Sequence, residues 1–138
     1  MHLISINERH DRHAILYQLL SERDETINIS HRAMPTWEDH VRFVESEPYE
    51  AWYFVVSGDG LCDRPIGACY LSRNNEIGIS ILKAEKGKGY GPEAIKAIIE
   101  KHGPGRYLAN INPRNEPSKR VFSNLGFRKI QETYELNA

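Results

Sequence analysis

A glycine-rich segment, Lys86-Gly-Lys-Gly-Tyr-Gly91, joins a strand-like stretch at 76–82 to a helical stretch that begins at Pro92. Alternating isoleucines indicate the strand, and apolar residues at helical spacing indicate the helix. Glycine adopts a positive φ without steric cost and lets a ligand approach the backbone closely. N–H groups converge at the start of a helix, whose dipole favours an anion. The segment therefore predicts a phosphate or pyrophosphate site.

The rest of the chain predicts strands and helices that would surround this site. Three successive strands joined by short turns, typical of an antiparallel meander, are expected at 52–56, 66–71 and 77–82. A short strand and two helices are expected before them, at 3–6, 9–22 and from Thr36, where Thr36 and Asp39 resemble a capping box. Two strands are expected after the helix that starts at Pro92, at 107–111 and 127–134, on either side of a helix at 115–125.

The predicted order is therefore β-α-α-β-β-β-α-β-α-β. It describes an α+β fold with a mixed, mostly antiparallel sheet flanked by about four helices. A chain of 138 residues has the usual size of one domain, so a single domain spanning residues 1–138 is expected.

Composition argues against several kinds of partner. The net charge of −1 gives no support for binding to nucleic acid or to an anionic membrane. No apolar run approaches the ~20 residues that span a bilayer, and no signal peptide is recognised, so a cytoplasmic protein is expected. Cys62 and Cys69 are the only cysteines, too few for a disulfide framework or a four-cysteine zinc site, and no metal is expected.

Two common phosphate-binding motifs do not match the glycine segment. A nucleotide P-loop needs Gly-x-x-x-x-Gly-Lys-Ser/Thr, which the chain lacks. A dinucleotide fingerprint needs Gly-x-Gly-x-x-Gly at the start of a βαβ unit, whereas the glycines here are spaced Gly-x-Gly-x-Gly after a predicted hairpin.

The segment instead resembles the Gln/Arg-x-x-Gly-x-Gly/Ala motif of the GNAT acetyltransferase superfamily. A second stretch, Asn115-Glu-Pro-Ser118-Lys-Arg-Val-Phe122-Ser-Asn-Leu-Gly126-Phe127, resembles that family's Asn-x-x-Ser/Ala-x-x-x-Tyr-x-x-x-Gly-Phe signature. A predicted helix and strand separate the two motifs, as in the family. The resemblance runs from about Trp52 to Phe127, and the two helices before it suit the family's N-terminal part.

The resemblance implies that acetyl-CoA is the co-substrate. Its pyrophosphate would lie on the glycine segment, and its pantetheine arm would lie in a gap where strand 77–82 splays from strand 107–111. Backbone groups near Ile81 and Leu82 would pair with the amides of the arm, and a backbone N–H near Leu82 would polarise the thioester. The implied cofactor-binding residues are Ile81, Leu82, Lys86, Gly87, Lys88, Gly89, Tyr90, Gly91, Asn115, Ser118 and Phe122.

Two residues depart from the family pattern. Lys86 keeps the positive charge of the usual Gln/Arg position but lacks the bidentate fork of arginine. Phe122 stands where the family often has a tyrosine proposed as the general acid. The departing thiolate must then leave unassisted or take a proton from Tyr70, Tyr90 or water.

Acetyl transfer to an amine also calls for a base, because most alkyl amines are protonated at pH 7. Glu76, at the start of a predicted strand, is the first candidate for this base. The alternative interpretation is that Glu76 is an exposed carboxylate after a turn. His31 is the second candidate, since histidine titrates near neutrality.

The predicted activity is transfer of an acetyl group to a primary amine of a small molecule. The N-terminal half resembles a subgroup that acetylates nucleotide-linked amino sugars, through Ile27-Asn-Ile-Ser-His31 and Thr36-Trp-Glu-Asp-His40. A non-catalytic CoA-binding regulatory module and an acetyltransferase acting on a protein amine are the alternatives. A homodimer is left open.

Overall fold

A computed structural model of the chain describes residues 1–24, 33–58 and 64–138. The strands are β1 (His2–Ser5), β2 (Ala51–Ser57), β3 (Arg64–Leu71) and β4 (Ile77–Ile81). The helices are α1 (Arg12–Ser21), α2 (Trp37–Glu45), α3 (Tyr90–His102) and α4 (Glu116–Asn124). Two single 3-10 turns, η1 (Ile6–Glu8) and η2 (Lys83–Glu85), follow β1 and β4. Among the described helices, none combines the length and apolar character that crossing a bilayer requires.

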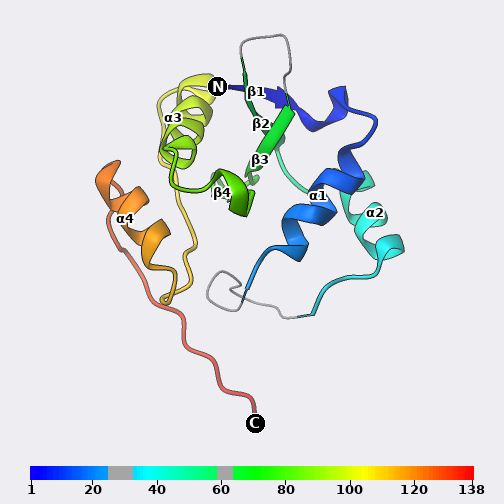
Figure 1. Cartoon of the computed structure of the whole chain (residues 1–138). Helices are drawn as coiled ribbons and strands as arrows, with labels where there is room; N and C mark the ends of the chain where they lie inside the picture. Colours follow the sequence, from blue (N-terminus) through cyan, green and yellow to red (C-terminus); the bar gives the residue numbers. More distant parts are fainter. Residues whose placement is uncertain (25–32, 59–63) are drawn as a thin grey trace.

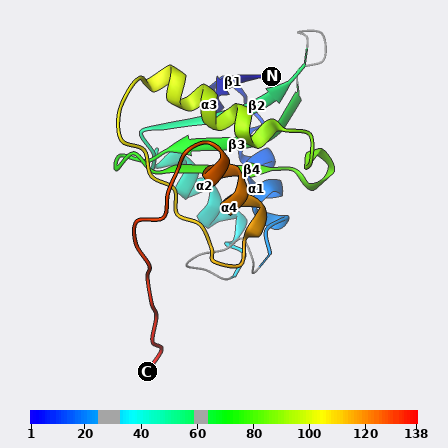
Figure 2. The same ribbon diagram turned by 90° about the vertical axis from the view of Figure 1, so that its left-hand side faces the viewer.

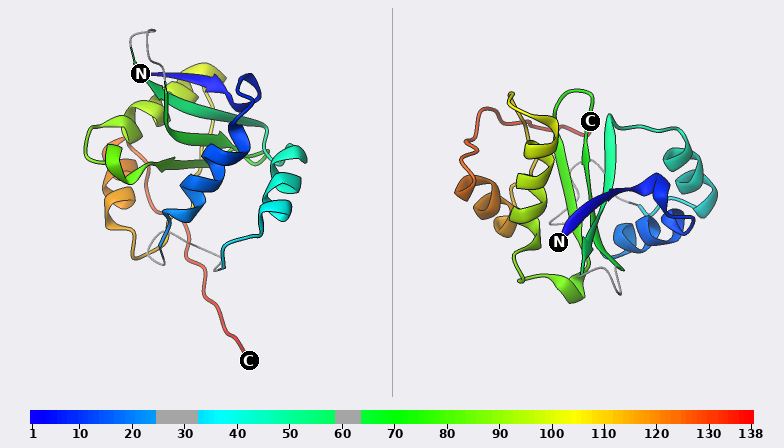
Figure 3. Two further views of the ribbon diagram at one scale, coloured as in Figure 1. Left: turned by 45° about the vertical axis from the view of Figure 1, so that its right-hand side comes forward. Right: turned by 90° about the horizontal axis from the view of Figure 1, so that it is seen from above.

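The four strands form one antiparallel sheet in the order β1-β2-β3-β4. Helices α1 and α2 cover one face of this sheet, and α3 and α4 lie on the other (Figure 1 and Figure 3, right). Each face buries an apolar cluster, one with Phe54, Leu16 and Val44 and the other with Ile95, Ile98 and Phe122. The expected α+β fold, with four helices and a mostly antiparallel sheet, is confirmed.

The predicted meander is confirmed, but the last two predicted strands are wrong. Segment 107–111 contributes a single parallel bridge, between Leu108 and Glu76, and residues from 127 onward form no strand. The alternation of side chains in both segments suits a sheet surface. A strand also needs a neighbour to accept its backbone hydrogen bonds, and in this structure the two segments lack one along most of their length.

Helix boundaries follow the predicted local signals closely. The Thr36 side chain accepts a hydrogen bond from the N–H of Asp39 and begins α2, although the Asp39 carboxylate pairs with Arg42 instead of completing a capping box. The Asn115 side chain accepts from the N–H of Ser118 at 3.3 Å and begins α4. Helix α3 begins at Tyr90, two residues before the predicted proline, and ends at Gly103.

Candidate active site

The glycine segment forms a tight turn between η2 and α3, and the packing of α3 against the sheet holds it in place (Figure 2). Gly87 and Gly89 have φ values of +82° and +83°, in the left-handed region that favours glycine. Gly91 lies in the first turn of α3. A Cβ atom placed on Gly87, Gly89 or Gly91 would have no neighbouring atom within 4 Å. The turn therefore presents its backbone to open space.

The N-terminus of α3 has backbone donors without a side-chain cap. Gly89 occupies the N-cap position and offers no side chain to accept hydrogen bonds. The first intrahelical bond runs from the N–H of Glu93 to the carbonyl of Gly89, at 3.5 Å. The N–H groups of Tyr90 and Gly91 come before this first bond and have no acceptor within the helix, and Pro92 has no N–H group. These donors and the helix dipole together suit an anion.

A buried carboxylate fixes the base of this turn. Glu85 accepts hydrogen bonds from Lys88 Nζ at 2.9 Å and from Arg64 Nη2 at 2.6 Å. The hydrogen bond from Lys88, followed by that from Arg64, holds the pKa of Glu85 below its ordinary value. Lys88 therefore carries a charge that Glu85 already balances in part, whereas Lys86 is exposed and has no ion pair among the described residues. Glu85 was not identified from the sequence, because there it is one of several charged residues in a polar stretch.

Strand β4 lies at one edge of the sheet, opposite β1, and the alternation of its residues decides which backbone N–H and carbonyl groups lack a partner strand. The carbonyl of Glu76 accepts from Ser72 N–H, and the N–H of Leu82 donates to the Ile66 carbonyl. Even-numbered residues therefore direct their backbone groups toward β3, since an antiparallel strand alternates its bonding side and no bulge interrupts this pair. Odd-numbered residues face the other way, which leaves Ile79 and Ile81 with N–H and carbonyl groups directed to the open edge.

Beyond that edge, segment 107–111 touches β4 and then diverges. The N–H of Ile77 donates to the Leu108 carbonyl at 2.8 Å, and the N–H of Leu108 donates to the Asn75 carbonyl at 2.9 Å. No ladder continues from Leu108 among the described residues. The expected splay is therefore present, and it opens next to Ile79 and Ile81. Leu82 was expected to offer its backbone there, but its N–H is already bonded to β3. Ile79 was not identified from the sequence, because choosing it requires the strand register.

Glu76 lies where β4 and segment 107–111 meet. Its carboxylate accepts a hydrogen bond from Ser72 Oγ at 3.0 Å and another from Asn110 Nδ2 at 2.7 Å. The side chain is half-buried, so the exposed-carboxylate interpretation is wrong. By the alternation of β4, Glu76 and Gly78 share one face of the strand.

Two stacked tyrosines lie on the same face as Glu76. The rings of Tyr49 and Tyr70 are 3.8 Å apart and almost parallel, and Tyr70 pairs with Gly78 across β3 and β4. Burial raises the pKa of Tyr70 and Glu76 raises it further, while Arg23 lowers it. Burial also raises the pKa of Tyr49, as do the adjoining Tyr70 phenol and the hydrogen bond between the two. Both phenols therefore keep their protons at neutral pH. Tyr49 lies in a loop and gave no periodic signal in the sequence.

Gly78 makes room for the Tyr70 ring. A Cβ atom on Gly78 would lie 2.1 Å from two ring atoms of Tyr70, and stacking on Tyr49 leaves that ring little freedom to move. We therefore expect Gly78→Ala to lower the free energy of unfolding by about 1–3 kcal/mol, measured by urea denaturation. In a Tyr70→Ala background the same change should cost much less. An equal cost in both backgrounds would show that the ring is not the obstacle.

The other candidate residues make no hydrogen bond to Glu76 among the described residues. Phe122 is only 4% exposed and packs in the core, with the ring of Phe127 5.0 Å away. Tyr90 is partly buried against the same core at the start of α3, at the opposite end of β4 from Glu76. Asn115 and Ser118 are joined by the helix cap. His31 lies outside the described residues.

A cavity of about 380 Å³ opens at the end of the sheet where β2 begins, and its lining includes Tyr49, Trp52 and Arg73. The glycine turn follows the opposite end of β4, so this cavity is not the candidate phosphate site.

Comparison with known folds gives several similar structures. A domain from Methanocaldococcus jannaschii superposes with a TM-score of 0.83 at 21% identity, covering 96% of this chain and 91% of that one. A spermidine N-acetyltransferase chimera built from Vibrio cholerae and human enzymes has a TM-score of 0.70 at 12% identity, covering 95% and 84%. A putative acetyltransferase from Salmonella typhimurium, solved with acetyl-CoA, has a TM-score of 0.63 at 16% identity, covering 92% and 79%. Among curated proteins, none matches the sequence significantly.

The family model of the acetyltransferase (GNAT) domain matches residues 2–128, which is most of the chain. That match agrees with the two motifs, with the fold, and with the splay that opens beside β4. Enzymes of this family transfer an acetyl group from acetyl-CoA, their co-substrate, to an amine. The chain belongs to the GNAT acetyltransferase family and is an acetyl-CoA-dependent N-acetyltransferase.

Proposed function

We propose that the protein acetylates a primary amine of a small molecule, with a nucleotide-linked amino sugar as the first acceptor class to test. The amine attacks the thioester of acetyl-CoA directly. The observation that carries the proposal is the open backbone edge of β4 at Ile79 and Ile81, which lies between the glycine turn and Glu76.

Acetyl-CoA would extend from the glycine turn along β4. Its pyrophosphate would accept hydrogen bonds from N–H groups between Gly87 and Gly91, with Lys86 supplying charge and Glu85 holding Lys88 beside the turn. The amides of the pantetheine arm would pair with the backbone of Ile79 and Ile81, as an added strand pairs with a sheet edge. The N–H groups of Ile79 and Ile81 are also the candidates to polarise the thioester, because the N–H of Leu82 already donates to the carbonyl of Ile66.

Glu76 is the proposed base for the incoming amine, directly or through one water. Its hydrogen bonds from Ser72 and Asn110 support this role, because they orient the carboxylate without neutralising its charge. His31 stays a second candidate.

The thiolate would leave unassisted or take a proton from a phenol or from water, because Phe122 has no proton to give. Tyr90 and Tyr70 are the two candidates. Tyr70 shares a face of the sheet with Glu76 and keeps its proton at neutral pH, whereas Tyr90 lies at the glycine turn. The phenylalanine variant of the true donor should lower kcat while leaving the Kd of acetyl-CoA unchanged.

Asn115 has a structural role that must be separated from any contact with acetyl-CoA. We expect Asn115→Ala to cost about 1 kcal/mol of stability through the lost cap of α4 and also to weaken acetyl-CoA binding. Asn115→Asp keeps a capping oxygen but loses the amide donor. It should therefore retain stability while still weakening binding in a titration by calorimetry. Full affinity in Asn115→Asp would leave Asn115 with the capping role alone.

The test of the proposal has two steps. First, acetyl-CoA should raise the melting temperature saturably, while ATP and NAD should not, because bound ligand stabilises the folded state. Second, release of free CoA thiol should be measured with nucleotide-linked amino sugars, polyamines and a peptide with a free amino group. Turnover on the peptide alone would identify a protein amine as the acceptor. Binding without turnover on any amine would favour the non-catalytic CoA-binding module.

A further inference from the structure

The face of the sheet that α1 and α2 cover holds more than the candidate base. Ala68 packs in the apolar cluster on that face, and Tyr70, two residues further along β3, lies on the same face. Tyr70 pairs with Gly78, and its ring stacks on the ring of Tyr49. The charge of Glu76 acts on Tyr70, so two neutral phenols lie near the Glu76 carboxylate. A ligand bound on this face meets O–H donors as well as a negative charge.

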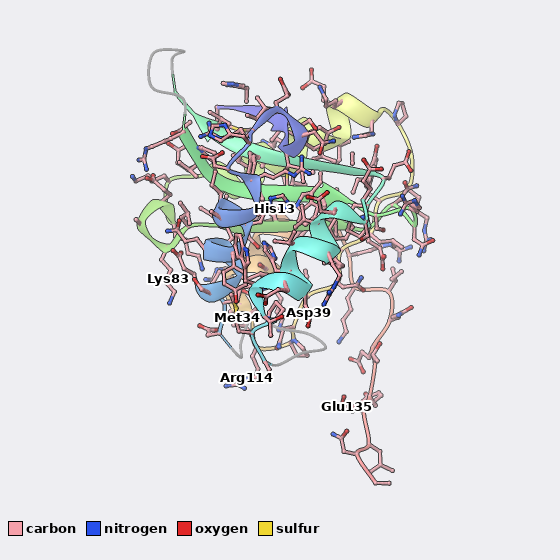
Figure 4. All side chains as sticks on the ribbon, turned by 90° about the vertical axis from the view of Figure 1, so that its right-hand side faces the viewer. His13, Met34, Asp39, Lys83, Arg114 and Glu135 are labelled. Carbon is pink, nitrogen blue, oxygen red and sulfur yellow. The ribbon has the colours of Figure 1, made fainter. Side chains whose placement is uncertain are left out.

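The C-terminal end of α1 is fastened to the same sheet. The N–H of Lys83, which follows β4, donates a hydrogen bond to Glu22 Oε1 at 2.7 Å. Figure 4 shows Lys83 beside this end of α1, whereas Glu135 lies far away on the C-terminal tail. Arg23 is the residue after Glu22, and its side chain is exposed. The packing of α1 therefore brings the Arg23 guanidinium to the neighbourhood of β4.

Arg23 is a cation without a counter-ion in the described parts of the chain. No side-chain hydrogen bond or ion pair engages its guanidinium within residues 1–24, 33–58 and 64–138. Burial raises the pKa of both Tyr49 and Tyr70, and the charge of Arg23 lowers both. A cation favours the ionised form of a phenol only when it lies nearby. Arg23 is therefore directed at the face that carries Glu76.

These groups suit an acceptor with two charged ends. The Glu76 carboxylate is the partner for the amine, and the Arg23 guanidinium is free to bind an anion. A guanidinium is a planar fork of N–H donors that matches carboxylates and phosphates. The glycine turn continues into α3, on the opposite face of the sheet, so the phosphates of acetyl-CoA are not the expected partner of Arg23 (Figure 3, right).

We propose that the acceptor carries an anionic group, a carboxylate or a phosphate, which Arg23 binds while Glu76 meets the amine. This inference rests on the proposed function and narrows its acceptor class. A nucleotide-linked amino sugar meets the requirement through its phosphates, whereas a polyamine does not. Arg23 selects the acceptor and takes no part in bond formation.

The test compares amines in matched pairs, one member with an anion and one without. The pairs are aminoethyl phosphate with ethylamine, β-alanine with propylamine, and a nucleotide-linked amino sugar with the free amino sugar. The first two pairs distinguish phosphate from carboxylate. Release of CoA thiol gives kcat/KM for each amine. Titration calorimetry on the protein saturated with CoA gives the Kd of each amine without requiring turnover.

The variants separate the charge of Arg23 from its shape. Arg23→Gln removes the charge, and Arg23→Lys keeps the charge but loses the fork. Arg9→Gln is the matched control, because Arg9 precedes the opposite end of α1 and pairs with Asp11 at 2.9 Å. The parent is expected to favour the anionic member of at least one pair by about tenfold or more, in kcat/KM and in Kd. Arg23→Gln should lose this preference and keep its activity on neutral amines, Arg23→Lys should keep part of the preference, and Arg9→Gln should keep all of it.

Several results would overturn the proposal. One is equal kcat/KM and Kd for the two members of every pair, and another is a preference that Arg23→Gln leaves intact. Weaker acetyl-CoA binding in Arg23→Gln would assign Arg23 to the co-substrate and would also overturn it. If no amine turns over, the proposed function fails, and the calorimetric preference still decides for or against the anion site.

Discussion

Replacing Gly89 with glutamate is expected to weaken acetyl-CoA binding by at least ~100-fold, or about 2.7 kcal/mol. Gly89 is the N-cap of α3 with φ near +83°, and a side chain there would project into the space where the pyrophosphate is proposed to lie. The carboxylate would repel the phosphates and could itself accept hydrogen bonds from the exposed N–H groups. Titration calorimetry with acetyl-CoA measures the effect.

Gly103→Glu is the matched control, because Gly103 lies at the other end of the same helix with φ near +88° and equally open surroundings. Both variants place a side chain at a positive φ and add the same charge, and the backbone cost is the larger at Gly103, because its ψ of −176° lies in a region almost restricted to glycine. Only Gly89→Glu should lose acetyl-CoA binding. Equal affinity in the two variants would reject the glycine turn as the phosphate site.

Glu76→Gln is expected to lower kcat/KM by ~100-fold at pH 7, a typical contribution of a positioned base. At this pH an alkyl amine with a pKa near ~10.4 is almost wholly protonated, so a base must remove its proton. As the pH rises toward the pKa of the amine, free amine becomes plentiful and the loss should shrink. The measurement is the pH profile of kcat/KM for the variant and the parent protein.

Glu100→Gln is the control for Glu76→Gln, since Glu100 is an exposed carboxylate near the C-terminal end of α3. It should leave the profile unchanged. The melting temperature of Glu76→Gln must also be compared with that of the parent. Ser72 and Asn110 each donate to a different carboxylate oxygen of Glu76, and the glutamine amide has only one oxygen acceptor. A loss of activity that is equal at every pH would contradict the base role.

Features that depend on a few neighbouring residues were predicted well. The positive φ of Gly87 and Gly89, the cap at Thr36 and the start of a helix at residue 115 all follow from local backbone preferences. The meander followed from alternating side chains and short turns, because consecutive strands with short connections pair with each other.

Features that depend on distant partners were predicted poorly. The alternation at 107–111 and 127–134 suggested strands, but a strand forms only where another backbone is available to pair with it. Ile81 and Leu82 were expected to face the ligand, whereas the register of β3 and β4 turns the N–H of Leu82 inward and opens Ile79 together with Ile81. A shift of one residue in the β3–β4 register would exchange the inward and outward backbone groups, and the sequence alone does not determine that register.

The sequence by itself determined the glycine turn, the helix that follows it and the second motif, and through them the family. These features are local, since each depends on residues within one turn or one helix. Only the tertiary structure decided that Glu76 meets Asn110 and Tyr70, and that β4 keeps an open edge beside the turn. The Glu76–Asn110 hydrogen bond joins residues 34 apart along the chain, and strand register and packing, rather than residue type, bring all these groups together.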